Sequence, residues 1–153
     1  MDLVEQLKRS ARMKKMHIVL GEGPDPRMVE AAATLVREEI CSVSIIGPEE
    51  ETLAEARKQN LNFSGVTIVD IKKSDKVDEF ANEFHEIRKH KGLTVEEAKK
   101  LLTDDDLGTL YFGSMMIKKG LADGMVTGAC HSTGSVLRAA IQVVGTSPGV
   151  KVV

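Results

Sequence analysis

HIVLGEGPDPRMVEAAATLVREEICSVSIIG, residues 17–47, contains the pattern that decides the fold. The apolar runs HIVLG (17–21) and SVSIIG (42–47) each end in glycine and are typical of short buried strands. The segment 26–40 between them is rich in helix formers, with Asp25 placed to cap the helix and Pro26 at its first position. The order strand, helix, strand predicts two parallel strands joined by a helix.

The same alternation continues along the rest of the chain. Segment 107–120 is apolar nearly all round and should therefore be a buried helix, and Thr94 with Glu97 has the spacing of a capping box. We expect an α/β fold of three layers, with helices on both faces of a mostly parallel sheet. The further strands are expected at 66–70, 123–128 and 149–153, and the further helices at 1–13, 48–60, 76–92, 94–102, 107–120 and 133–144.

Composition excludes several classes of function. The 153 residues are enough for one domain with a sizeable core, and 42% hydrophobic with 29% charged residues is typical of globular proteins. A net charge of −2 and 3% aromatic residues argue against binding to nucleic acid, and no apolar run approaches the length of a membrane span. Cys41 and Cys130 have no metal-ligand spacing, so we expect no metal, and a reducing cytoplasm is the simplest location.

TGACHSTGSVLR, residues 127–138, is the first candidate site, because it follows a predicted strand and opens a predicted helix. Ligands of open α/β sheets bind at the carboxyl ends of strands, and a helix N-terminus has free N–H groups and a positive dipole end. The hydroxyls of Ser132 and Thr133, with Arg138 leaning back along the helix, could complete a phosphate cradle. The alternative is that Ser132 or Thr133 only caps the helix and Arg138 lies on the surface. The spacing of these residues favours neither the phosphate cradle nor the plain helix cap.

Two further features carry weaker signals. EIRKHKGLT (86–94) places basic residues from Arg88 to Lys91 before Gly92, which favours a helix end that complements the dipole over a basic lip for a polyanion. Cys130 next to His131 could suggest a nucleophile and its base. Neighbours in sequence usually point in different directions, so we expect Cys130 to be a small buried residue.

Three segments taken together resemble a known family. They are FANEFHEIRKHKGLTVEEAKKLL, YFGSMMIKKGLADGMVTGACHSTGSVLRAAIQVV and TSPGVKVV, and the joint occurrence of RKHKG-T, YFGSMM, ADG and HST-x₄-R is specific. The chain resembles phosphate acetyltransferases and their relatives the phosphate butyryltransferases over essentially its whole length. The segment HKG-T-EEA is more similar to the acetyl enzymes.

The resemblance implies a fold similar to that of isocitrate and isopropylmalate dehydrogenases, in which two α/β domains enclose the active site. Residues 1–153 would form the first domain and resemble the front part of such an enzyme. The family transfers an acetyl group between coenzyme A and inorganic phosphate, with acetyl-CoA and acetyl phosphate as small-molecule substrates. It uses no tightly bound cofactor and is generally a homodimer. The proposed catalytic base lies in the second domain, so we expect these residues alone to be inactive.

The resemblance also implies roles for individual residues. Arg138 matches the family's catalytic arginine, which contacts substrate phosphate or carbonyl, and Arg88 matches an arginine linked to binding of CoA. Ser132 and Thr133 match hydroxyls near the phosphate, and His131 belongs to the same substrate-binding motif. Two alternatives remain open: a phosphate butyryltransferase, or a non-catalytic module that senses acyl-CoA or acetyl phosphate.

Overall fold

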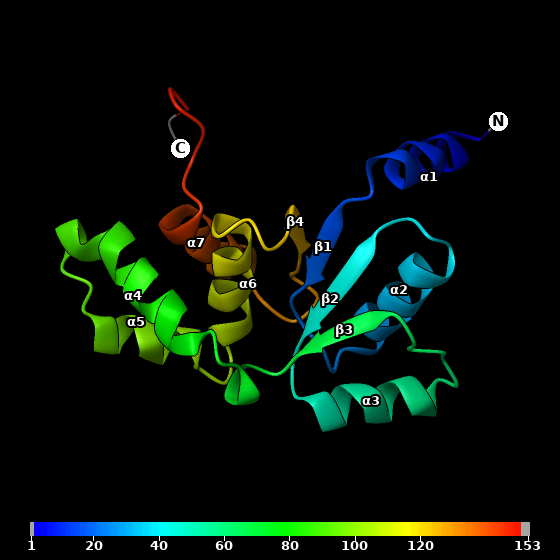
Figure 1. Ribbon diagram of the computed structural model, residues 1–153, viewed down its shortest axis with the longest axis horizontal. Coiled ribbons are helices and arrows are strands. Elements are labelled where there is room, and N and C mark those ends of the chain that lie inside the picture. Colours follow the sequence, from blue (N-terminus) through cyan, green and yellow to red (C-terminus); the bar gives the residue numbers. More distant parts are fainter. Residues whose placement is uncertain (1, 151–153) are drawn as a thin grey trace.

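Four parallel strands form the centre of the computed structural model, which describes residues 2–150 (Figure 1). Their order in the sheet is β3-β2-β1-β4, with β1 and β2 paired in register from His17 opposite Ser42. The predicted parallel sheet is therefore confirmed. The strands are β1 (His17–Leu20), β2 (Ser42–Ile46), β3 (Val66–Val69) and β4 (Gly124–Val126).

Helices cover both faces of this sheet, which confirms the three-layer architecture. Side chains of α2 and α3 form one core with the strands, and side chains of α4 to α7 form the other. The helices are α1 (Leu3–Lys14), α2 (Pro26–Arg37), α3 (Glu49–Lys58), α4 (Val77–Arg88), α5 (Val95–Leu102), α6 (Gly108–Lys118) and α7 (Thr133–Val143), with 3₁₀ turns η1 (Ile71–Lys73) and η2 (Lys89–Lys91).

Strand alternation divides the two cores. Leu20 and Ile45 belong to the core with α2, whereas their neighbours Val19 and Ile46 belong to the core with α6. Successive side chains of a strand point to opposite faces, so an apolar run buries residues on both. This is why Val19 and Leu20 of β1, and Ile45 and Ile46 of β2, are apolar at consecutive positions.

Helix α6 is buried nearly all round, as its sequence predicted. Phe112 packs against Phe80 of α4 with ring centroids 4.8 Å apart. A Cβ atom at Gly113 would lie 2.5 Å from the Sδ atom of Met125, so the glycine permits a close approach to β4. Helix α6 thus fixes the position of α4 relative to the sheet.

The predicted helix ends are also confirmed where the sequence carried a specific signal. Asp25 accepts a hydrogen bond from the Arg27 backbone N–H at the start of α2, and Thr94 and Glu97 form both bonds of a capping box. Gly92 adopts a φ of +83° after η2. These local features depend on a few neighbouring residues, so they can be read from the sequence.

The strand predicted at 149–153 is not confirmed. Residues 148–149 form a turn closed by the Val150 N–H on the Ser147 carbonyl, and residues 151–153 lie outside the described part of the chain. The helix predicted at the N-terminus is present as α1, but none of its residues is buried. Within residues 2–150, no helix has the length and apolar character needed to cross a membrane.

Candidate active site

The loops that follow β1 and β4 lie side by side at the carboxyl end of the sheet. These strands are parallel neighbours, with Leu20 opposite Val126, and the Gly21 N–H donates to the Val126 carbonyl at 3.2 Å. A Cβ atom at Gly21 would lie 2.7 Å from the Thr127 hydroxyl oxygen, so the glycine permits the close approach. The loop at 127–132 therefore meets the loop at 21–25, as expected of parallel strands.

The Glu22 carboxylate occupies the inside of the 127–132 loop. It is 4% exposed and accepts backbone N–H groups from four consecutive residues at 2.9–3.2 Å. Burial would raise the pKa of Glu22, but these hydrogen bonds and one from the His131 ring outweigh it and lower the pKa. The charged carboxylate is thus the anion held by these amides. The four donors are Gly128, Ala129, Cys130 and His131.

The His131 ring is held at both nitrogens. Nδ1 lies 2.7 Å from the Glu22 Oε1 atom, and Nε2 lies 2.7 Å from the Asp106 carbonyl oxygen. Both partners only accept hydrogen bonds, so the protonated imidazolium satisfies both. Burial opposes that form, but the bonds to Asp106 and Glu22 outweigh it and raise the pKa of His131. With an 8% exposed side chain, His131 is bound within this chain, and its predicted contact with substrate stays a prediction.

A second set of contacts ties the same loop to the start of α2. The Arg27 guanidinium donates to the Ala129 carbonyl at 2.8 Å and forms an ion pair with Asp25 at 2.7 Å. Cys130 is exposed, so its prediction as a buried residue is wrong, and its Sγ atom lies 3.2 Å from the Asp25 carboxylate. That hydrogen bond raises the pKa of Cys130, which disfavours the thiolate and a nucleophilic role.

Ser132 caps α7. Its hydroxyl accepts the Ser135 N–H at 3.2 Å, which is the capping role that the sequence left as an alternative. Thr133 is the first residue of the helix and is exposed. Neither residue lines the pocket that contains Arg138, so the structure does not join these hydroxyls and the arginine in one cradle.

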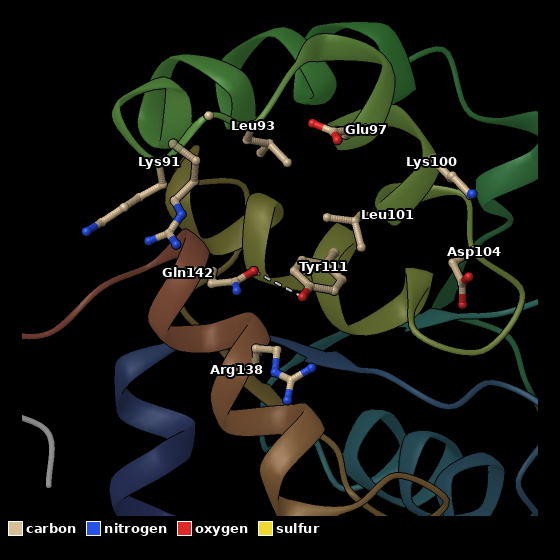
Figure 2. A pocket seen from close by; sticks show the side chains of 11 residues that line it. Lys91, Leu93, Glu97, Lys100, Leu101, Asp104, Tyr111, Arg138 and Gln142 are labelled. Carbon is tan, nitrogen blue, oxygen red and sulfur yellow. Dashed lines mark hydrogen bonds between the residues drawn. The ribbon is translucent and has the colours of Figure 1, made fainter.

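Arg138 and Arg88 instead line one pocket of about 600 Å³, whose other lining residues come mainly from α5, α6 and α7. Figure 2 shows Arg138 and Gln142 of α7 on one side of this pocket and Leu101 of α5 on another. Within residues 2–150, neither guanidinium has a hydrogen bond or ion pair with the rest of the chain. Buried Tyr111 lines the same pocket and donates its hydroxyl to Gln142 at 3.1 Å. Burial raises the pKa of Tyr111, and the charges of Arg138 and Arg88 oppose that shift, so both cations act on the same phenol.

The other charges of this pocket are partly compensated. The Glu97 carboxylate accepts the Thr94 N–H in the capping box, and Asp104 accepts the Leu107 N–H at 2.7 Å. Lys91 and Lys100 add positive charge at its border. The pocket therefore has two uncompensated arginines, an apolar wall from Leu93 and Leu101, and one buried phenol. Such an arrangement suits an anionic group attached to an apolar or aromatic one.

Sequence reasoning missed Glu22, Tyr111 and Gln142. Glu22 lay in the connection between a predicted strand and a predicted helix, to which no site was assigned, and Tyr111 lay in a helix interpreted only as core. The available signal for Glu22 was a single acid between two glycines at the end of a strand, a place where open sheets bind ligands. No group of three or more His, Cys, Asp or Glu residues within 2–150 is arranged to hold a metal ion.

Comparisons with known proteins match the chain over its whole length. Residues 2–153 match the family described as phosphate acetyl/butaryl transferase. A phosphate acetyltransferase of Clostridium acetobutylicum is 39% identical over all 153 residues, and one of Thermoanaerobacterium thermosaccharolyticum is 40% identical. In both cases the chain spans 45% of the relative's length.

Solved structures agree with the sequence comparisons. A phosphotransacetylase from Streptococcus pyogenes superposes with a TM-score of 0.89 at 38% identity, over 99% of this chain and 45% of that one. EutD phosphotransacetylase from Staphylococcus aureus gives 0.86 at 37% identity, over 98% of this chain and 44% of that one. The α/β fold, the pocket with its two arginines and these matches lead to one conclusion: the chain belongs to the phosphate acetyl/butyryl transferase family.

Proposed function

We propose that this chain forms part of the active site of a phosphate acetyltransferase, which transfers an acetyl group reversibly between coenzyme A and inorganic phosphate. The observation that carries the proposal is the pair of unpaired arginines, Arg88 and Arg138, that line one pocket. An unpaired guanidinium facing a pocket is a ready binding group for phosphate. The relatives that match the full length of the chain are named phosphate acetyltransferases, which favours acetyl over butyryl transfer.

Arg138 is proposed as the catalytic residue. The CoA thiolate attacks the carbonyl carbon of acetyl phosphate, the new C–S bond forms, and the C–O bond to phosphate breaks. Negative charge grows on the carbonyl oxygen and then on the departing phosphate, and it returns to the same atoms in the reverse reaction. A fixed guanidinium stabilises this charge without having to reorganise during the reaction. Ser132 and Thr133, at the start of the same helix, are proposed to bind phosphate on the ground of the family resemblance alone, since neither lines the pocket of Arg138.

Arg88 is proposed to bind a phosphate group of CoA. It ends α4 and is half-buried, with exposed Lys91 beyond it at the border of the pocket. Arg88 comes from the end of α4 and Arg138 from α7, so the arginine proposed for CoA and the catalytic arginine are held by different elements. Holding the two substrates from two elements of one pocket orients the thiol toward the acetyl group, and orientation supplies a large share of such catalysis.

The proposal extends to the setting of the enzyme. Its partners are the small molecules acetyl-CoA, phosphate and acetyl phosphate, and it acts as a homodimer in the cytoplasm. The two cysteines of the described chain, Cys41 and Cys130, are free thiols, which fits a reducing compartment. Residues 1–153 alone are expected to be inactive, because the chain spans only 45% of its relatives and lines a pocket open to solvent.

The test is a kinetic assay on the protein that contains these 153 residues. Acetyl-CoA formation from CoA and acetyl phosphate is followed at the thioester absorbance, with butyryl phosphate as the competing substrate. A higher kcat/KM for acetyl phosphate than for butyryl phosphate supports the proposal. Binding of acetyl-CoA without any turnover would instead favour a sensing module, and the reverse substrate preference would favour a phosphate butyryltransferase.

A further inference from the structure

We infer that Glu22 is a positioning residue for acyl transfer, since its buried carboxylate fixes the 127–132 loop and thereby the start of the helix that presents Arg138. The inference rests on the proposed function. Glu22 does not line the pocket with the two arginines, so it would act through the loop and not on substrate. Its partners determine the geometry of the whole connection from β4 to α7.

The environment of Glu22 requires a carboxylate. Four backbone N–H groups and the His131 ring all donate to its two oxygens, and no acceptor faces it in these contacts. A glutamine at this position would have the same shape but would turn an NH₂ group toward N–H donors. A carboxylate accepts at both oxygens, and N–H bonds to a charged acceptor are about twice as strong as neutral ones.

The internal carboxylate also occupies the backbone N–H groups of residues 128–131, so these four amides are not free for a substrate phosphate. Successive backbone N–H groups that converge form an anion-binding nest. Here Glu22 fills the nest, and the loop backbone is compensated before any substrate arrives. Positive charge without an internal partner then remains on residues that line the pocket, Arg88 and Arg138 among them.

The connection from Glu22 to Arg138 is short and has little freedom. His131 is bonded to Glu22, Ser132 caps α7 directly after it, and Arg138 lies in the second turn of that helix. Further along, Ala139 and Val143 are buried against the core, so the far half of α7 is fixed by packing. The loop fixes the near half. Loosening it would let the first turns of α7 shift while the core stays in place.

His131 extends the same contact to a third element. Its Nε2 atom reaches the Asp106 carbonyl in the connection between α5 and α6, and these helices also line the Arg138 pocket through Leu101 and Tyr111. The pair Glu22 and His131 therefore joins the end of β1, the 127–132 loop and the wall of the pocket. A change at Glu22 would alter both sides of the site that Arg138 faces.

The variant Glu22→Gln tests the inference in the protein that contains this chain. We expect kcat/KM for acetyl phosphate to fall up to about a hundredfold, as misplacement of a reacting group by about 1 Å can cause. KM for CoA should stay within about twofold of wild type, since Arg88 lies on another element. Glu22→Asp keeps the charge and should recover part of the loss, and Glu30→Gln on the exposed face of α2 is the matched control.

A double-mutant cycle separates positioning from simple damage to the fold. In an Arg138→Ala background, Glu22→Gln should cost less than about twofold, because the group that it positions is absent. Equal losses in both backgrounds would overturn the inference. So would equal increases in KM for both substrates.

Amide hydrogen exchange supplies a readout that does not depend on activity. Glu22→Gln should raise exchange at residues 128–131 while the β1 and β2 amides stay protected. Unchanged protection at 128–131 would contradict the role of the carboxylate. If Glu22→Gln does not fold, the same exchange is measured on Glu22→Asp. A wild-type protein without acetyl transfer would overturn the proposed function and the catalytic role of Glu22, but would leave the exchange prediction for the loop standing.

Discussion

Replacing Arg138 by alanine should separate catalysis from stability. The residue is exposed on α7 and has no hydrogen bond or ion pair within residues 2–150, so its removal leaves no partner unpaired. Alanine is also the best helix former. We therefore expect the free energy of unfolding to change by no more than about 0.5 kcal/mol.

The expected effect on catalysis is much larger. In the proposed mechanism Arg138 donates to oxygens that gain charge during transfer, and losing one such donor costs about 10²–10³ in rate, or about 2.7–4 kcal/mol of transition-state stabilisation. Arg138→Lys retains the charge but loses the planar guanidinium, so its activity should be intermediate. Since Arg138 has no competing internal partner, the whole charge is available to the substrate.

The assay is steady-state formation of acetyl-CoA with acetyl phosphate varied at saturating CoA, together with thermal unfolding of each variant. Arg57→Ala is the control, because Arg57 is an exposed arginine of α3 on the opposite face of the sheet. The catalytic role predicts a loss of about 10²–10³ in rate. It would therefore be refuted if Arg138→Ala unfolded like the wild type and kept a kcat/KM within about threefold of it. Equal losses for Arg57→Ala would show that the assay responds to net charge and not to position.

Three further predictions concern Arg88, stability and pH. Arg88→Ala should raise KM for CoA far more than KM for acetyl phosphate, and equal increases would favour a structural role at the helix end. Thr94→Ala removes the capping box of α5 and should lower the free energy of unfolding, measured in urea, by about 1 kcal/mol. Thr103→Ala is the control, and an unchanged free energy for Thr94→Ala would show that the cap does not stabilise the fold. The pKa of His131 is raised, so its contribution to stability is complete below its ordinary pKa of 6.5 and is lost as pH rises through the folded value. Unfolding measured between about pH 6 and pH 9 should show this loss, and an identical slope in His131→Gln would contradict it.

The sequence was a sufficient guide wherever the controlling interactions are local. The strand and helix order, the caps at Asp25 and Thr94 and the turn at Gly92 depend on residues within a few positions, and each is present. The strand predicted from GVKVV had no such local support, since so short a segment specifies neither a partner nor a turn, and its last three residues lie outside the described part of the chain. Residues 148–149 form a turn.

The pairing of Arg88 with Arg138 could not be derived from spacing. Fifty positions separate them, and the local pattern around Arg88 favoured a helix end that complements the dipole. Both descriptions are correct, because Arg88 ends α4 and also lines the pocket. Their meeting depends on how α4, α6 and α7 pack over one face of the sheet, through buried contacts such as Phe84 with Tyr111. From the sequence, only the family resemblance predicted that both arginines belong to one active site.

Glu22 shows most clearly what the sequence left undetermined. One of the two interpretations of the 127–138 segment was an anion site at the start of the helix; the structure has an anion one turn earlier, at the amides of residues 128–131, and that anion is a carboxylate of the same chain. An alternation of strands and helices does not fix their order in the sheet, and Glu22 can reach this loop only because β4 lies next to β1. A nest of backbone amides binds whichever anion is held closest, and a covalently attached carboxylate needs no free ligand in solution. Whether such a loop binds substrate or stabilises itself is therefore decided by strand order, a property of the whole sheet and not of the motif.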